Sequence, residues 1–125
     1  MSKSKDLFGV CPYFTAQKVL ASKWSMYLLY LLSEHEGIRF NELLRLMPED
    51  MTHTTLSRQL KSLEDYNMIV RKDYQQIPPR VEYSLSDIGE EFRTVIQDIG
   101  SWGTKYIAQL RKWIDAEKKL LTFFS

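Results

Sequence analysis

Hydrophobic side chains recur at helical spacing over much of the chain. Between Trp24 and His35 they occupy nearly every side of a helix, which predicts that this helix is central to the core. A shorter helix is expected before it, over residues 13–21, because Pro12 suits a first helical turn. From Phe40 to Met47 the spacing i, i+3, i+4, i+7 predicts a two-turn helix that Pro48 ends.

A short turn separates this helix from the next one, which we expect over residues 52–66. Thr52 is a suitable N-cap, and Asn67 tolerates the left-handed conformation that closes a helix. The inward stripe of the helix consists of Leu56, Leu60 and Leu63. The order is therefore helix, short turn, helix.

An extended pattern follows. Residues 68–70 are apolar, residues 71–76 are polar, and Pro78 and Pro79 then break the pattern. Residues 81–85 alternate between apolar and polar, so two strands with a proline-containing tip are predicted, which is a β-hairpin. Ser86 is expected to cap one final helix with acidic residues in its first turn. The apolar stripe of that helix starts at Phe92 and continues past two glycines toward the C-terminus.

The composition indicates an ordinary globular protein. The chain has 125 residues, of which 44% are hydrophobic and 26% are charged, and it contains neither a repeat nor a linker-like segment. We therefore expect one domain over residues 1–125. The expected fold is mainly α with a small β-hairpin wing, a winged helix-turn-helix with dimerisation helices at both ends of the chain.

Several classes of function are disfavoured. The apolar run from Trp24 to Leu32 is shorter than the about 20 residues that cross a bilayer, so we expect a cytoplasmic protein without a membrane partner. The single cysteine, Cys11, allows neither an intramolecular disulfide nor a cysteine-based metal site. With only His35 and His53 as histidines, and no glycine-rich phosphate loop, we expect no enzyme activity, no metal and no cofactor.

The helix expected over residues 52–66 has an unusual outward face, because it carries no acidic residue before Glu64. Hydroxyl, amide and cationic groups bind base edges and phosphate oxygens, which an acid would repel, and a helix N-terminus adds partial positive charge. A solvated helix face is the alternative explanation. The candidate recognition-helix residues are Thr52, His53, Thr54, Thr55, Ser57, Arg58, Gln59 and Lys61.

The surrounding elements favour DNA as the partner. An amphipathic helix before the turn and a hairpin after the second helix give the arrangement in which a wing grips the DNA backbone. The net charge is only +1, but basic residues gather over 58–80 and acidic ones over 87–98. A winged-helix module that binds only other proteins is the alternative. The candidate wing and flanking residues are Lys23, Arg71, Lys72, Gln75, Gln76 and Arg80.

Five segments stand in a characteristic order: 11–12 (Cys-Pro), 22–24 (Ser-Lys-Trp), 39–43 (Arg-Phe-Asn-Glu-Leu), 56–64 (Leu-Ser-Arg-Gln-Leu-Lys-Ser-Leu-Glu) and 78–85 (Pro-Pro-Arg-Val-Glu-Tyr-Ser-Leu). In sequence and spacing they resemble the HxlR family of bacterial regulators, within the MarR-like superfamily, over roughly residues 10–108. The resemblance implies a homodimeric winged-helix protein that binds double-stranded operator DNA as a repressor or, less often, as an activator. Ser22 and Asn67 stand where the family usually has glycine, and 52–55 is not its commonest version, so no operator sequence is carried over.

A dimer interface is expected from helices at the two ends of the chain. Their apolar surface exceeds what one small domain needs, and a homodimer is the commonest oligomer. Aromatic residues there could instead line a small-molecule pocket, although cores and interfaces use aromatics more generally. The candidate interface residues are Phe14, Trp102, Tyr106, Ile107, Leu110 and Trp113.

Cys11 allows two interpretations. In oxidant-sensing relatives a cysteine at this position is similar to a redox switch, which makes an oxidant or electrophile a candidate effector beside a small ligand. Such a switch needs an accessible thiolate near positive charge, which Lys5, Lys18 or Lys23 could supply. The alternative is a buried structural cysteine.

Overall fold

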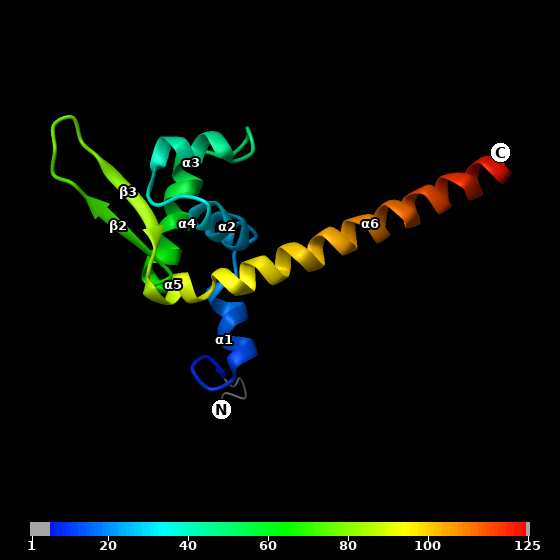
Figure 1. The fold of residues 1–125 in the computed structure, drawn as a ribbon, viewed down its shortest axis with the longest axis horizontal. Helices are drawn as coiled ribbons and strands as arrows, with labels where there is room; N and C mark the ends of the chain where they lie inside the picture. The colour runs from blue at the N-terminus through cyan, green and yellow to red at the C-terminus, as the bar shows by residue number, and fades with distance from the viewer. Residues whose placement is uncertain (1–5, 125) are drawn as a thin grey trace, which may run out of the picture. The chain divides into compact units, whose positions relative to one another are not determined.

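The computed structural model describes residues 6–124. The chain forms two compact units, the first ending at Phe92 and the second beginning at Arg93 (Figure 1). The first unit contains α1 (Pro12–Val19), α2 (Ser25–Ser33), β1 (Ile38–Arg39), α3 (Phe40–Leu46), α4 (His53–Asp65), β2 (Ile69–Asp73), β3 (Val81–Leu85) and α5 (Asp87–Glu91). The second is the single helix α6 (Arg93–Phe124). The expectation of one domain over residues 1–125 stays a prediction.

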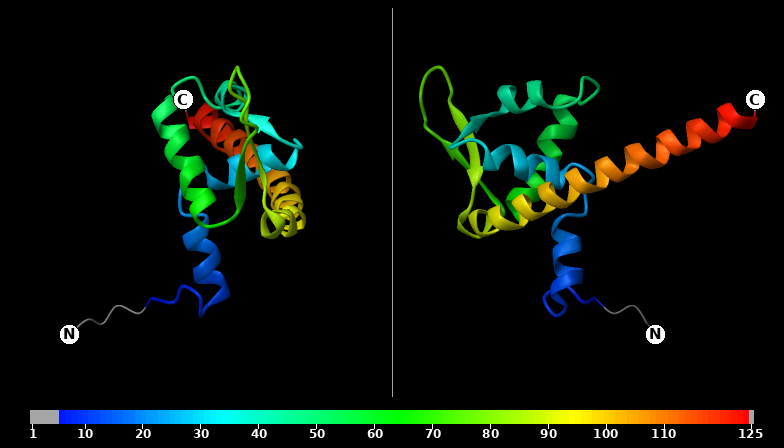
Figure 2. Two further views of the ribbon diagram at one scale, coloured as in Figure 1. Left: turned by 90° about the vertical axis from the view of Figure 1, so that its left-hand side faces the viewer. Right: turned by 45° about the vertical axis from the view of Figure 1, so that its right-hand side comes forward.

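A three-stranded antiparallel sheet, in the order β1-β3-β2, lies in the first unit. The predicted hairpin is confirmed, but β2 runs on through the polar residues 71–73 because these pair with 81–83 of β3. The short extended piece at Ile38–Arg39 joins the sheet by pairing with Tyr83 and Glu82. Figure 2 shows from two further sides that the β2–β3 loop extends away from its sheet.

The core of this unit is built from leucines of three helices. Leu28, Leu29 and Leu32 of α2 are completely or almost completely buried, as the near-circular apolar pattern predicts. The inward stripe of α4 is confirmed, since Leu56, Leu60 and Leu63 are all buried. Leu43 of α3 and Ile38, Ile69 and Leu85 of the strands complete the interior.

Local signals fix the bounds of α4. The side chain of Thr52 accepts a hydrogen bond of 3.1 Å from the backbone N–H of Thr55, which confirms Thr52 as the N-cap. At the other end Asn67 adopts a positive φ of 61°, as expected for the residue that closes the helix. The recognition-helix candidates therefore lie on a helix that begins and ends where the sequence predicts.

The expectation of one continuous final helix is wrong. Ser86 caps α5 by accepting a hydrogen bond from the N–H of Gly89, as predicted, but α5 ends at Glu91. The N–H of Phe92 bonds to the carbonyl of Gly89, three residues back, so the last turn tightens and a second helix begins at Arg93.

Taken by itself, α6 is a continuous helix of 32 residues. Large apolar side chains follow one side of it, and many are exposed; Trp102 and Trp113, for example, are 62% and 51% exposed. No helix within residues 6–124 combines the length and the apolar character needed to span a membrane.

Candidate nucleic-acid interface

The outward face of α4 presents the predicted residues to solvent. Of the eight candidates, Thr55 and Gln59 are half-buried and the other six are exposed. The helix has no acid in its first turn, and the N-terminal N–H groups add partial positive charge at that end. The N-terminal half of α4 is therefore electrostatically suited to approach a polyanion. We define the recognition face as Thr52, His53, Thr54, Thr55, Ser57, Arg58, Gln59 and Lys61.

Lys61 differs from the rest of the recognition face, because its charge already has a partner. Its ammonium lies 3.1 Å from a carboxylate oxygen of Asp65, one turn further along α4. The hydrogen bond and the charge of Asp65, together with the charge of Glu64, raise the pKa of Lys61 above its ordinary value. Arg58 is thus the more available cation of the recognition face toward a ligand.

An open groove of about 640 Å³ runs beside the recognition face. It joins the start of α3, the N-terminal half of α4 and the sheet, so that residues from Arg39 to Tyr83 share one surface. His53 lies in it with its ring centroid 4.2 Å from that of Phe40. We call it the α3–wing groove; its polar and basic lining includes Arg39, Asn41, Arg45, His53, Ser57 and Arg71.

Three of these lining residues were missed by the sequence reasoning. Arg39, Asn41 and Arg45 come from β1 and α3, where Glu42 interrupts the basic pattern, so no run of like charges marks them. Only the pairing of β1 with β3 brings Arg39 toward the wing. Ile77 was missed as well: it is fully exposed in the β2–β3 loop, although it is apolar.

The wing carries its predicted residues in two different environments. Arg71, Lys72, Gln75 and Gln76 are exposed, and Gln75 adopts a positive φ of 52° in the loop. Arg80 is half-buried, because its guanidinium stacks over the ring of Tyr74 and pairs with Glu82. The predicted basic wing is thus present, with Arg80 held at the base of the loop.

Other predicted residues are not among those that line the α3–wing groove. Lys23 precedes α2, and its ammonium lies 5.0 Å from the ring of Trp24. Phe14 is on α1 and is 38% exposed. The remaining interface candidates are all on α6 and all exposed: Trp102, Tyr106, Ile107, Leu110 and Trp113.

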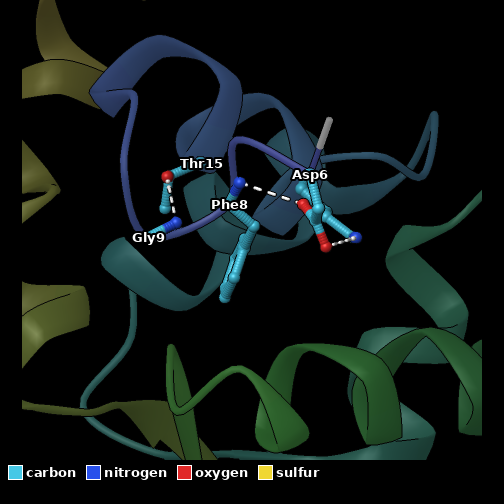
Figure 3. Close-up of polar contacts among 5 residues, drawn as sticks. Asp6, Phe8, Gly9 and Thr15 are labelled. Carbon is cyan, nitrogen blue, oxygen red and sulfur yellow. Dashed lines mark hydrogen bonds and ion pairs between the residues drawn. The ribbon is translucent and has the colours of Figure 1, made fainter. Parts of the chain in front are cut away.

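Cys11 stands immediately before α1 and is half-buried. Its exposure is therefore intermediate between the accessible redox switch and the buried structural cysteine that the sequence leaves open. Its backbone is well held, because its N–H donates to the carbonyl of Leu7 at 2.8 Å. The loop before it is closed by hydrogen bonds from Phe8 to Asp6 and from Gly9 to Thr15 (Figure 3). Lys18, which could have activated the thiol, pairs instead with Asp6 at 3.6 Å.

Two of the three lysines that were expected to lie near the thiol of Cys11 have other partners. Lys18 also lies over the ring of Phe8, and Lys23 lies over that of Trp24. Lys5, the third candidate, lies outside the described residues. Cys11 is the N-cap residue of α1, a helix of eight residues without an acid in its first turn.

Comparison with known proteins agrees with this architecture. The chain is 40% identical over 94 residues to the HTH-type transcriptional regulator BH0655 of Halalkalibacterium halodurans, covering 75% of this chain and 82% of that protein. It is 39% identical over 116 residues to the HTH-type transcriptional regulator YdeP of Bacillus subtilis, covering 93% and 88%. The solved structure of the redox regulator HypR in its oxidized form is similar with a TM-score of 0.69 at 34% identity, covering 76% of this chain and 96% of that one.

The family profile described as HxlR-like helix-turn-helix matches residues 19–111. This range contains α2 to α5, the recognition face, the α3–wing groove and the first part of α6. The resemblance inferred from the five sequence segments is thereby confirmed, and the fold is the winged helix-turn-helix that it implied. The chain belongs to the HxlR-like helix-turn-helix family of transcriptional regulators.

Proposed function

We propose that this protein is a transcriptional regulator that binds double-stranded operator DNA as a homodimer, with α4 in the major groove and the wing on the sugar-phosphate backbone. The observation that carries the proposal is the recognition face, an exposed and acid-free surface at the N-terminal half of α4. Its hydroxyl, amide and guanidinium groups are those that read base edges. Such a protein acts in the cytoplasm, where the genomic DNA of a bacterium lies.

The α3–wing groove supports the proposed docking. Arg39, Arg45 and Arg71 line it beside His53 and Ser57 of the recognition face. Phosphate contacts fix the register of a protein on the duplex, whereas base contacts select the sequence. We therefore assign phosphate binding to the arginines of the groove and base recognition to Ser57, Arg58 and their neighbours on α4.

The homodimer is proposed from α6. Its apolar side chains are spaced along one side of the helix over its whole length, and an apolar face of this extent is covered in most proteins by another chain or another domain. A second copy of α6 offers a matching face, as symmetric dimers require. Two recognition helices related in this way would read two half-sites about one helical turn apart.

Cys11 is the proposed sensing residue. It is half-buried rather than enclosed, and it directly precedes α1. The similar protein HypR is named a redox regulator, and its oxidized form has been solved. We propose that a two-electron oxidant such as diamide converts Cys11 to a disulfide, either with Cys11 of a second copy or with a small thiol, and that this change alters DNA affinity.

The test is a mobility-shift titration of the protein with its own upstream intergenic DNA and a scrambled control, at two salt concentrations, with and without diamide. Sequence-selective binding that weakens with salt is expected, because phosphate contacts release counterions from the DNA and added salt reduces the free energy gained from that release. Equal binding of both DNAs contradicts sequence-specific recognition, whereas binding of neither DNA favours a protein-binding module instead. Cys11→Ser is the control for the oxidant: it should bind DNA normally and ignore diamide, whereas an unchanged response would place the sensor elsewhere and direct the search to a small ligand.

A further inference from the structure

An acidic residue sits within the wing. Glu82 lies on β3, the central strand, and pairs in register with Arg39 of β1 on one side and with Lys72 of β2 on the other. Its side chain is only 17% exposed. A carboxylate on a surface that approaches DNA opposes binding, so its position within a basic wing requires a structural reason.

The contacts of Glu82 supply that reason. One carboxylate oxygen accepts hydrogen bonds from Nε of Arg80 at 3.0 Å and from its terminal guanidinium nitrogen at 2.9 Å. The other oxygen accepts a hydrogen bond from the hydroxyl of Tyr74 at 3.2 Å. Glu82 thus connects Tyr74, the residue that follows β2, with Arg80, the residue that precedes β3.

Tyr74 and Arg80 also contact each other. The guanidinium of Arg80 lies 4.2 Å from the centroid of the Tyr74 ring, and the ammonium of Lys72 lies 4.6 Å from the same centroid. The N–H of Tyr74 donates to the carbonyl of Arg80 at 2.9 Å, which closes the loop between them. We call Tyr74, Arg80 and Glu82 the wing cluster.

The rest of the unit leaves room for Glu82 by means of a glycine. Gly37, which precedes β1, has a positive φ of 131°, and a β-carbon there would lie 2.7 Å from a carboxylate oxygen of Glu82. The hydrogen bonds from Arg80 and Tyr74, and the charges of Arg80 and Arg39, lower the pKa of Glu82 below its ordinary value. The carboxylate is therefore charged at neutral pH and bound on two sides.

We propose that Glu82 is a positioning residue for DNA binding, which holds Tyr74 and Arg80 so that the loop between β2 and β3 leaves the sheet at one fixed angle. Arg80 then acts chiefly as the internal partner of Glu82 instead of as a free phosphate ligand. The predicted effect of Glu82 on DNA binding rests on the proposed function. The predicted ordering of the β2–β3 loop by Glu82 does not depend on that function.

Two effects of neutralising Glu82 have opposite signs, which makes the proposal testable. Removing a negative charge near phosphate tightens DNA binding in general. Removing an anchor of the loop weakens operator binding, because the loop must then be ordered when the complex forms. The proposal states that the second effect is the larger one at the operator.

The experiment compares wild type with Glu82→Gln, Tyr74→Phe and Arg80→Lys, measuring affinity for operator and scrambled DNA and amide exchange of Tyr74 in the free protein. We expect Glu82→Gln to bind the operator about 10-fold more weakly, the size of one charged hydrogen bond, and to exchange the Tyr74 amide faster. Arg80→Lys keeps the charge but loses the planar fork and the stacking, so it should weaken operator binding in the same direction. Tyr74→Phe, the mildest change, should speed exchange with the fold intact.

The matched control is Glu42→Gln, which removes an exposed acid from α3 on the α3–wing groove. It should tighten binding to both DNAs and leave exchange of the Tyr74 amide unchanged. The proposal is overturned if Glu82→Gln behaves like this control. If wild type binds no DNA, the proposed function fails. The exchange rate of the residue-74 backbone amide, compared between wild type, Tyr74→Phe and Glu82→Gln, then decides by itself whether the wing cluster orders the loop.

Discussion

The carbonyl oxygen of Met68 lies against the α-carbon of Gly89, in the space that a β-carbon would occupy. The same carbonyl accepts a hydrogen bond of 3.0 Å from the N–H of Ser86. The residue that precedes β2 is thereby packed directly on the cap and first turn of α5. This close approach fixes where the hairpin returns to the helical part of the first unit.

Gly89→Ala should therefore destabilise the protein, since the added methyl group must displace backbone. We expect a loss of about 1 to 3 kcal/mol in the free energy of unfolding, measured by urea denaturation. Gly100→Ala is the control, because open space surrounds Gly100 in the helix interior. It should leave stability unchanged or raise it, as alanine is the better helix former. Equal effects of the two substitutions would contradict the packing described.

Thr52→Ala should destabilise α4 from its N-terminus. The substitution removes the oxygen that accepts the N–H of Thr55, at a cost of about 1 kcal/mol. Thr52→Ser keeps that oxygen and should be near wild type. Thr54→Ala, two residues further along and likewise exposed, should lower the thermal denaturation midpoint only slightly. If Thr54→Ala were the more damaging change, the N-cap assignment would be wrong.

Leu110→Glu should dissociate the proposed dimer. A charge within the apolar stripe of α6 would be buried without a partner at the interface. Sedimentation equilibrium should then show a monomer at concentrations where wild type is a dimer. Lys112→Glu puts the same charge on the opposite side of the helix and should leave the dimer intact. A Leu110→Glu protein that still sediments as a dimer would move the interface away from α6.

The pH dependence of the wing follows from the lowered pKa of Glu82. Because the pKa is lowered in the folded protein, the stabilisation is complete above the ordinary glutamate value of about 4.3 and disappears as the pH falls through the folded-state pKa. Arg80→Ala removes the largest cause of the lowering, so the pKa should rise toward the ordinary value. A carboxyl NMR titration checks both statements. A Glu82 pKa that is the same with and without Arg80 would refute the wing cluster.

Much of this fold was predictable because its signals are local. The caps at Thr52 and Ser86, the left-handed Asn67 and the leucine stripe of α4 depend on residues within a few positions of one another. The end of α5 was not predictable in that way. The apolar spacing continues through Phe92, whereas the break depends on backbone hydrogen bonds in the last turn that the spacing does not register.

The candidate site likewise has one part that local sequence signals predict and another that depends on contacts between distant residues. The acid-free face of α4 is visible in a linear sequence because one helix carries it. The α3–wing groove is not, since β1 must first pair with β3 to bring Arg39 beside the wing. Arg80 was assigned to DNA from its charge alone, while its pairing with Glu82 becomes visible only when the hairpin is folded.

The most direct test of the central claim, that the recognition face of α4 reads DNA sequence, is a binding selection from a random double-stranded library with wild type and Arg58→Ala in parallel. We expect wild type to enrich an inverted repeat whose half-sites lie about one helical turn apart. Arg58→Ala should enrich the same repeat with relaxed preference at one position of each half-site, at a cost of about 1 to 3 kcal/mol there. No enriched sequence with wild type, or an identical motif from both proteins, would contradict the claim.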